Sequence, residues 1–227
     1  RHRDNGGDIA DLKKQAMEEL SAIGVTFPVK ATYFIIASST SALDNATILK
    51  QCFTDSFGDD FIQLDLGTYV SSLAKEVRIP KLHGFVINGW GADYGDPQNF
   101  LGQELIGYDN ADYSANYSYI NEITEPKDYQ VELVDTYKEY TKMVEDANAI
   151  TDDMDARYAA YAKAEAYMLE NALVVPSNYS IGWCLSKINN ETRMFAKFGG
   201  VNNKVKNWVT KTTPYTTEEK VGTINFD

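Results

Sequence analysis

Hydrophobic positions recur first at helical and then at strand spacing in the opening third of the chain. Residues 8–23 carry apolar side chains three or four positions apart, which predicts an amphipathic helix capped by Asp8 and ended by Gly24. Residues 29–37 (VKATYFIIA) are rich in β-branched and aromatic side chains. They predict a strand directly after that helix.

A second helix and a second strand follow. Apolar side chains in residues 41–57 return to helical spacing and stop at Gly58, while residues 61–66 (FIQLDL) alternate as a strand does. A strand, a helix and a strand in this order form a βαβ unit, whose crossover is nearly always right-handed and whose strands are parallel. The fold class is therefore predicted as α/β, with a mixed, mostly parallel sheet flanked by helices.

The remaining pattern predicts more helices and three further strands. The expected helices are residues 69–77, 128–148 and 152–171, and the expected buried strands are 84–90 (GFVINGW), 173–176 and 181–185. Periodicity is weak after residue 200. We therefore expect a polar leader at 1–7, one α/β lobe at 8–200, and a polar tail or connection at 201–227.

Charge and cysteine content narrow the classes of function. The formal net charge is −12, which would repel nucleic acid and anionic membrane surfaces and suits a cationic or zwitterionic ligand, although an acidic surface also serves solubility alone. Two cysteines, Cys52 and Cys184, are too few for a disulfide framework or a zinc ribbon. Each is expected to be a small buried hydrophobic residue, and whether they form a bridge stays open.

Signatures of catalysis and of metal binding are weak. His2 and His83 are the only histidines, and the sequence has no GxSxG, HExxH or P-loop motif. The acidic run at 109–116 lacks the glycine and the closing glutamate of an EF-hand, so no metal and no cofactor are expected. Asp93 and Asp96 could form a glycosidase pair, which leaves a secreted carbohydrate-active or sugar-binding protein as the alternative class.

The segment GWGADYGDPQNF, residues 89–100, is the candidate binding loop. It follows the strand expected at 84–90, and ligands of open α/β sheets bind beyond the carboxyl ends of strands. There the Asp93 carboxylate could pair with a ligand ammonium while the Trp90 ring supplies an apolar wall and a cation–π face. A purely structural alternative places Trp90 in the core, uses Asp93 to cap a turn, and opens a short helix at Asp96 and Pro97.

Two separated motifs resemble one family of binding proteins. They are similar to the W-x-A-D-Y-x-D-P segment and the R-x-x-x-Y-x-x-A-E helix in the C-terminal lobe of extracellular solute-binding proteins of oligopeptide/dipeptide ABC transporters. The matching residues are Trp90, Ala92, Asp93, Tyr94, Asp96, Pro97, Arg157, Tyr161, Ala164, Glu165 and Pro176. The leading helix up to Gly24 is also similar, and the resemblance extends from about Asp8 to Trp208.

The resemblance implies a non-enzymatic lobe of the periplasmic-binding-protein-like type II fold. Such a protein captures short peptides in an interlobe cleft for a bacterial ABC importer. The family's roles, carried over to this sequence, give Asp93 the peptide α-ammonium and place Trp90 in the wall of the ligand channel. We expect Tyr94 to add to this apolar wall. The implied partners are short peptides, permease subunits and an N-terminal lobe that this sequence lacks; the implied location is the extracellular face of the membrane, through a lipid anchor, or the periplasm.

Overall fold

A computed structural model describes residues 6–177, 187 and 209–221 of the chain. It divides into two compact units, one of residues 1–89 and 106–135, the other of residues 90–105 and 136–227. The strand expected at 181–185 and most of the expected tail lie outside the described residues, and the domain limits expected from the sequence stay a prediction.

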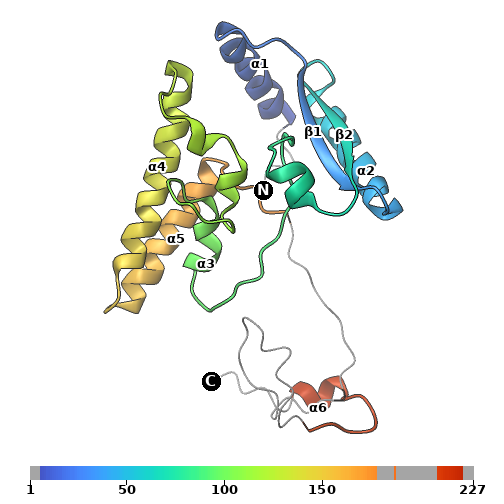
Figure 1. The fold of residues 1–227 in the computed structure, drawn as a ribbon, viewed down its shortest axis with the longest axis vertical. Coiled ribbons are helices and arrows are strands. Elements are labelled where there is room, and N and C mark those ends of the chain that lie inside the picture. Colours follow the sequence, from blue (N-terminus) through green and yellow to red (C-terminus); the bar gives the residue numbers. More distant parts are fainter. Residues whose placement is uncertain (1–5, 178–186, 188–208, 222–227) are drawn as a thin grey trace. The chain divides into compact units, whose positions relative to one another are not determined.

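The first unit contains the predicted βαβ pattern. Its elements are α1 (Gly6–Ala22), β1 (Val29–Ile36), α2 (Thr40–Phe57) and β2 (Ile62–Tyr69). The two strands pair in parallel over their whole length, from Val29 opposite Ile62 to Ile36 opposite Tyr69. Helix α2 packs against both strands and also contacts α1, as Figure 1 shows. The predicted α/β class and the parallel crossover are confirmed.

Local signals in the sequence set the ends of these helices. The Ser39 hydroxyl oxygen accepts a hydrogen bond from the Ala42 N–H at 3.2 Å and so caps the start of α2. Gly24 and Gly58 follow α1 and α2 with φ of +89° and +76°, a conformation that favours glycine. The predicted role of Asp8 is wrong, because α1 begins two residues earlier and Asp8 lies inside its first turn.

Apolar and aromatic side chains fill the space between α2 and the sheet. Leu64 of β2 and Ala46 of α2 are 2% and 1% exposed. The Phe85 ring lies parallel to Tyr33 of β1 and to Phe53 of α2, with centroid distances of 5.3 and 5.5 Å. Cys52, by contrast, is a free, exposed thiol, so its predicted burial is wrong. It lies on the outer face of α2, one residue before Phe53.

Two predictions between β2 and the candidate loop are wrong. The helix expected at 69–77 is a π-helical turn over Ala74–Arg78, because the backbone N–H groups of residues 70–72 bind the Glu76 carboxylate instead of entering a helix. Segment 84–90 is not a strand. Among the described residues its backbone makes one hydrogen bond to β1, from Gly84 N–H to the Thr32 carbonyl at 2.9 Å, which is too few for a ladder.

The second unit is built from helices. Its elements include α3 (Gln98–Leu101), α5 (Met154–Glu170), the end of α4 (Asp128–Ala149) and α6 (Thr217–Val221). Helices α4 and α5 confirm the helices expected at 128–148 and 152–171, run antiparallel after a short loop, and α3 contacts α5 (Figure 1). Residues 173–176 are not a strand, contrary to expectation.

The helix hairpin contains the core of the second unit. Its buried residues are Tyr140, Val144 and Ala147 on α4 and Tyr161, Ala164 and Met168 on α5. Tyr140 is fully buried, and its hydroxyl donates a hydrogen bond to the Leu101 carbonyl of α3 at 2.7 Å. Burial, with the Glu104 and Glu165 carboxylates nearby, raises the Tyr140 pKa, so this hydroxyl keeps its proton. The bond ties the end of α3 to α4.

Candidate functional site

Within the candidate loop, residues 90–97 are folded around one side chain at the start of α3, that of Asn99. The side-chain oxygen Oδ1 of Asn99 accepts two hydrogen bonds, from Trp90 Nε1 at 3.0 Å and from the Asp93 N–H at 2.8 Å. An added Cβ at Gly91 would meet nothing within 4 Å, so the backbone there borders open space. Asn99 therefore brings together the two residues that the sequence singled out first.

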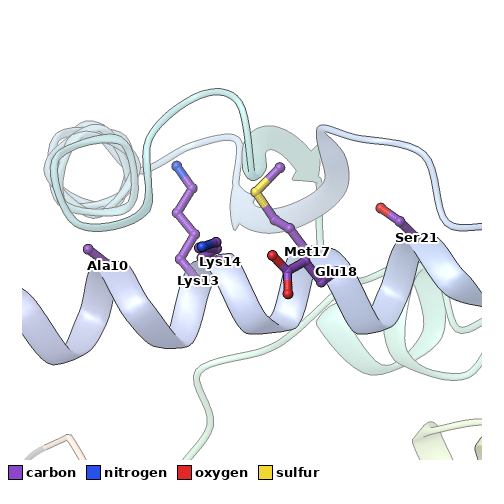
Figure 2. A pocket seen from close by; sticks show the side chains of 6 residues that line it. All are labelled: Ala10, Lys13, Lys14, Met17, Glu18 and Ser21. Atoms are coloured by element: carbon purple, nitrogen blue, oxygen red, sulfur yellow. The ribbon is translucent and has the colours of Figure 1, made fainter.

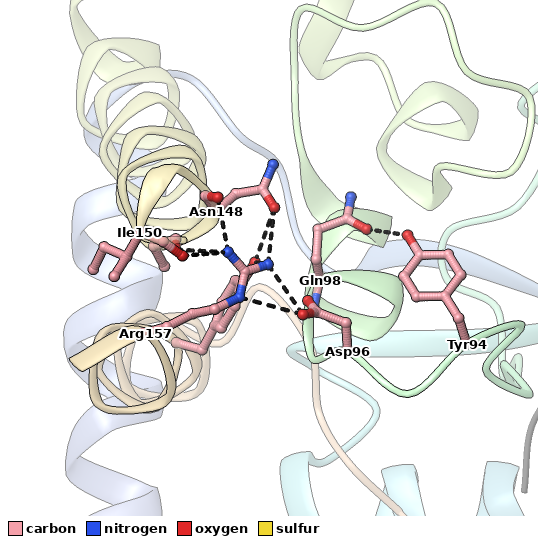
Figure 3. A network of polar contacts seen from close by, with 8 residues as sticks. Tyr94, Asp96, Gln98, Asn148, Ile150 and Arg157 are labelled. Atoms are coloured by element: carbon pink, nitrogen blue, oxygen red, sulfur yellow. Dashed lines mark hydrogen bonds and ion pairs between the residues drawn. The ribbon is translucent and has the colours of Figure 1, made fainter. Parts of the chain in front are cut away.

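Asp96 attaches the other end of the loop. Its Oδ1 accepts the Gln98 N–H at 3.0 Å, at the start of α3, and its Oδ2 accepts Nη2 and Nε of Arg157 at 3.0 and 3.3 Å (Figure 3). The Arg157 and Asp96 side chains are 11% and 24% exposed. The predicted alternative in which Asp96 and Pro97 open a short helix is thus correct for these two residues.

Arg157 also holds the end of α4. Its Nη1 donates to the carbonyls of Ala147, Asn148 and Ile150 at 3.2, 2.7 and 2.9 Å, groups that a helix end leaves without intrahelical partners. Its Nη2 donates to the Tyr161 hydroxyl oxygen at 2.9 Å. Burial, followed by the nearby Asp96 carboxylate, raises the pKa of Tyr161 to about 12. A neutral Tyr161 at physiological pH completes this network.

The three predicted site residues differ in their surroundings. Asp93 is exposed, and no described residue makes a hydrogen bond or ion pair with its carboxylate. Trp90 is half-buried, with its indole N–H used by Asn99. Tyr94 is exposed and donates its hydroxyl to the Gln98 side-chain oxygen, as Figure 3 shows. The loop therefore presents one carboxylate, that of Asp93, without a protein partner in the described chain.

A groove of about 500 Å³ lies beside Tyr94 in the second unit. Exposed aromatic rings from the loop, α3 and α5 line it, together with the Glu165 carboxylate. Those rings belong to Tyr94, Phe100 and Tyr158. Trp90 and Asp93 do not line this groove, so of the three predicted site residues Tyr94 is the one that borders it.

A second hollow, of about 710 Å³, runs along α1 in the first unit. Figure 2 shows its lining side chains on one face of that helix, among them Lys13, Lys14 and Met17. Lys13 is engaged with Asp60 at 2.6 Å. The Glu18 carboxylate also lines the hollow, so its charged groups are of both signs.

Groups for catalysis or metal binding are not gathered in the part of the chain that the structure describes. No cluster of His, Cys, Asp and Glu there could hold a metal ion, and no described helix is long and apolar enough to cross a membrane. His83 lies in a loop, and burial lowers its pKa. The Asp93 and Asp96 pair proposed for glycoside hydrolysis consists of one exposed carboxylate and one neutralised by Arg157.

Sequence reasoning missed the role of Asn99. Its only signal was its place within the quoted loop, since an asparagine side chain readily hydrogen-bonds nearby backbone groups. Arg157 was marked by its motif alone, and its bond with Asp96 spans 61 positions. The expected location of the loop at a strand end is wrong, because residues 84–90 do not pair as a strand.

Comparison with known proteins identifies the class of this chain. The oligopeptide-binding protein SarA of Streptococcus gordonii is 29% identical over 212 residues, which are 85% of this chain and 28% of SarA. The chain is a homologue of the oligopeptide-binding proteins. AmiA of Streptococcus pneumoniae, also named an oligopeptide-binding protein, is 26% identical over 175 residues, 74% of this homologue and 26% of AmiA. No family model matches the chain.

Solved structures confirm the fold of the homologue. The periplasmic binding protein DppA of Helicobacter pylori, in complex with the peptide STSA, matches 87% of the chain and 34% of its own length, with a TM-score of 0.51 and 22% identity. A peptide-binding protein of a peptide ABC transporter matches 72% of the chain and 62% of its own length, with a TM-score of 0.50 and 17% identity. The named relatives are binding proteins. The homologue spans roughly a quarter to 30% of the length of the curated relatives.

Proposed function

We propose that this homologue holds the amino terminus of a short peptide on the Asp93 carboxylate, as part of the substrate-binding component of an ABC importer. The observation that carries the proposal is the unequal state of the two loop carboxylates. Asp96 is neutralised by Arg157, whereas Asp93 is exposed and has no partner among the described residues. An ammonium group of a ligand would therefore be drawn to Asp93.

The surroundings of Asp93 fit an ammonium group and a short apolar chain. The half-buried Trp90 ring, fixed by Asn99, would supply an apolar surface with a cation–π face close to the Asp93 backbone. Tyr94 would contribute a second aromatic surface beyond this pair. The net charge of −12 favours cationic and zwitterionic ligands over anions at a distance.

The affinity of this chain by itself should be low. An exposed ion pair contributes about 0–1 kcal/mol, because water screens it. If a complete peptide site bound at about 1 μM, roughly 8 kcal/mol, and this chain supplied half of the contacts, the chain alone would bind at about the millimolar level. Methods that detect weak binding are therefore required.

The complete binding protein would contain further elements. Because the chain spans about 28% of SarA, we propose that a second lobe outside this sequence closes over the peptide and that the assembled protein delivers it to ABC permease subunits. A relative described as a periplasmic binding protein supports a location outside the cytoplasmic membrane. Attachment there by a lipid anchor is part of the same proposal.

NMR of the ¹⁵N-labelled chain during titration with trialanine tests this function. Three indole N–H signals exist because the chain has three tryptophans, and a Trp90→Phe variant identifies the signal of interest. We expect trialanine to shift the Trp90 indole signal and the amides of Asp93 and Tyr94. N-acetyl-trialanine, which lacks the ammonium group, should shift them about two- to fivefold less at equal concentration, as an exposed ion pair of up to about 1 kcal/mol allows. Equal shifts with both peptides would contradict the assignment of Asp93.

A further inference from the structure

The Arg157 guanidinium connects the candidate loop, 61 positions away, with the end of α4 and with α5 itself. It donates to Asp96 in the candidate loop, to carbonyls at the end of α4, and to the Tyr161 hydroxyl oxygen within α5. These bonds use both terminal nitrogens and Nε, and the Arg157 side chain is 11% exposed. A planar guanidinium can meet such a spread of acceptors, whereas a lysine ammonium cannot.

Asp96 links Arg157 to the start of α3 by hydrogen bonds. Its Oδ2 faces the guanidinium, and its Oδ1 accepts the Gln98 N–H, a donor that the start of a helix leaves unpaired. A carboxylate held on both sides has little freedom to rotate. Asp96 therefore adds a polar link between the first turn of α3 and Arg157 of α5, beside the packing of α3 on α5.

Asn99 completes the connection to the candidate ligand-binding residues. It follows Gln98 in α3 and holds both the Trp90 indole N–H and the Asp93 backbone N–H through one oxygen. The sequence of contacts is thus Arg157 to Asp96, Asp96 to the start of α3, and α3 through Asn99 to Asp93. Each step is a hydrogen bond or a peptide connection.

We propose that Arg157 is a positioning residue for peptide binding: through Asp96 and Asn99 it fixes where the Asp93 carboxylate and the Trp90 ring lie. This inference rests on the proposed function, since it assumes that Asp93 meets the ligand. Arg157 itself touches no ligand in this scheme. Arg157 holds the loop in one conformation before the peptide binds. Binding then costs less conformational entropy, so the affinity rises without an added contact.

Arg157 serves stability and loop position through different bonds, and two variants separate them. Asp96→Asn removes the ion pair, retains an oxygen that can accept the Gln98 N–H, and leaves the bonds from Arg157 to the α4 carbonyls in place. Asn99→Ala removes the hydrogen bonds from Trp90 Nε1 and the Asp93 N–H, while the ion pair between Asp96 and Arg157 stays intact. Asp146→Asn is the matched control, because it removes an exposed ion pair with Lys142 on α4 and none of the hydrogen bonds that connect Arg157, Asp96 and Asn99.

Two readouts are measured for each variant of the 227-residue chain. The first is the ratio of the dissociation constants for N-acetyl-trialanine and trialanine, obtained by NMR titration. The second, without any peptide, is the hydrogen-exchange rate of the Trp90 indole N–H, which the bond to Asn99 protects. Unchanged amide signals of α4 and α5 show that a variant is folded.

Asp96→Asn and Asn99→Ala should each lower the ratio toward one and speed indole exchange, with no such change in Asp146→Asn. Arg157→Lys, which keeps the charge but loses the fork, should lower the ratio in the same direction. If the ratio of dissociation constants is unchanged in both Asp96→Asn and Arg157→Lys, and both variants are folded, the positioning role of Arg157 is overturned while the proposed function stands. A wild-type ratio near one overturns the proposed function itself, and the positioning role with it.

Discussion

Replacing Tyr140 with phenylalanine should weaken the helical unit by removing one buried hydrogen bond. Tyr140 is 0% exposed, and its hydroxyl donates to the Leu101 carbonyl at 2.7 Å. Phenylalanine preserves the ring and its packing against α3 and α5. The change therefore tests the polar contact itself, and not the volume of the side chain.

The expected loss follows from the cost of an unpaired buried acceptor. Leaving a buried carbonyl without its donor costs about 1–3 kcal/mol. Leu101 is 7% exposed, so water can replace the hydroxyl only in part. With a urea dependence of about 2 kcal/mol per molar, this loss lowers the denaturation midpoint by about 0.5–1.5 M.

Urea denaturation followed by circular dichroism at the helical band measures this loss. Tyr158→Phe is the control, since Tyr158 lies on α5 of the same unit but is 46% exposed. Its free energy of unfolding should stay within about 0.5 kcal/mol of the wild type. If Tyr140→Phe is as stable as the Tyr158→Phe control, the hydrogen bond to Leu101 does not contribute as the structure implies.

Three further changes test other parts of the fold. Hydrogen bonds from the backbone N–H groups of Val70, and then of residues 72 and 71, lower the pKa of the Glu76 carboxyl to about 2. The ionised carboxylate therefore contributes fully to stability above its usual pKa of about 4.5, and this contribution is lost as the pH falls toward 2. Glu76→Gln should therefore reduce stability at pH 6 and narrow its difference from the wild type near pH 2, which acid titrations of the unfolding midpoint reveal. Gly67→Ala should cost about 1–3 kcal/mol in urea unfolding, because a Cβ there would come within 2.5 Å of the Phe34 ring on β1. Lys142→Gln, which breaks an exposed ion pair, should leave the midpoint unchanged, and a large loss would show that surface pairs matter more than assumed.

The parts of the fold that were predicted from sequence are those with a local cause. The βαβ unit of 29–69 follows from apolar spacing and from glycine after α2, and both operate within a few residues. Segment 84–90 has the composition of a buried strand, but strand formation also requires a neighbour. The described chain gives its backbone one hydrogen bond to β1, so the same residues do not form a strand.

The candidate site shows the same division between local and distant causes. The motif placed Trp90 and Asp93 in a loop, and the short helix after Asp96 was legible from the proline that follows it. Which of the two carboxylates is engaged depends on Arg157, 61 positions away from Asp96. A contact over that separation has no signature in a single sequence, so the structure was needed to tell the two apart.

The most direct test of the account compares Asp93→Asn with the wild type in binding trialanine and N-acetyl-trialanine. Asparagine preserves the shape of the side chain and removes its charge. The account predicts that wild-type protein prefers the free-amine peptide and that Asp93→Asn loses this preference, while its affinity for the acetylated peptide is unchanged. Equal losses of affinity for both peptides, or a preference that persists in the variant, would show that Asp93 does not bind the ammonium group.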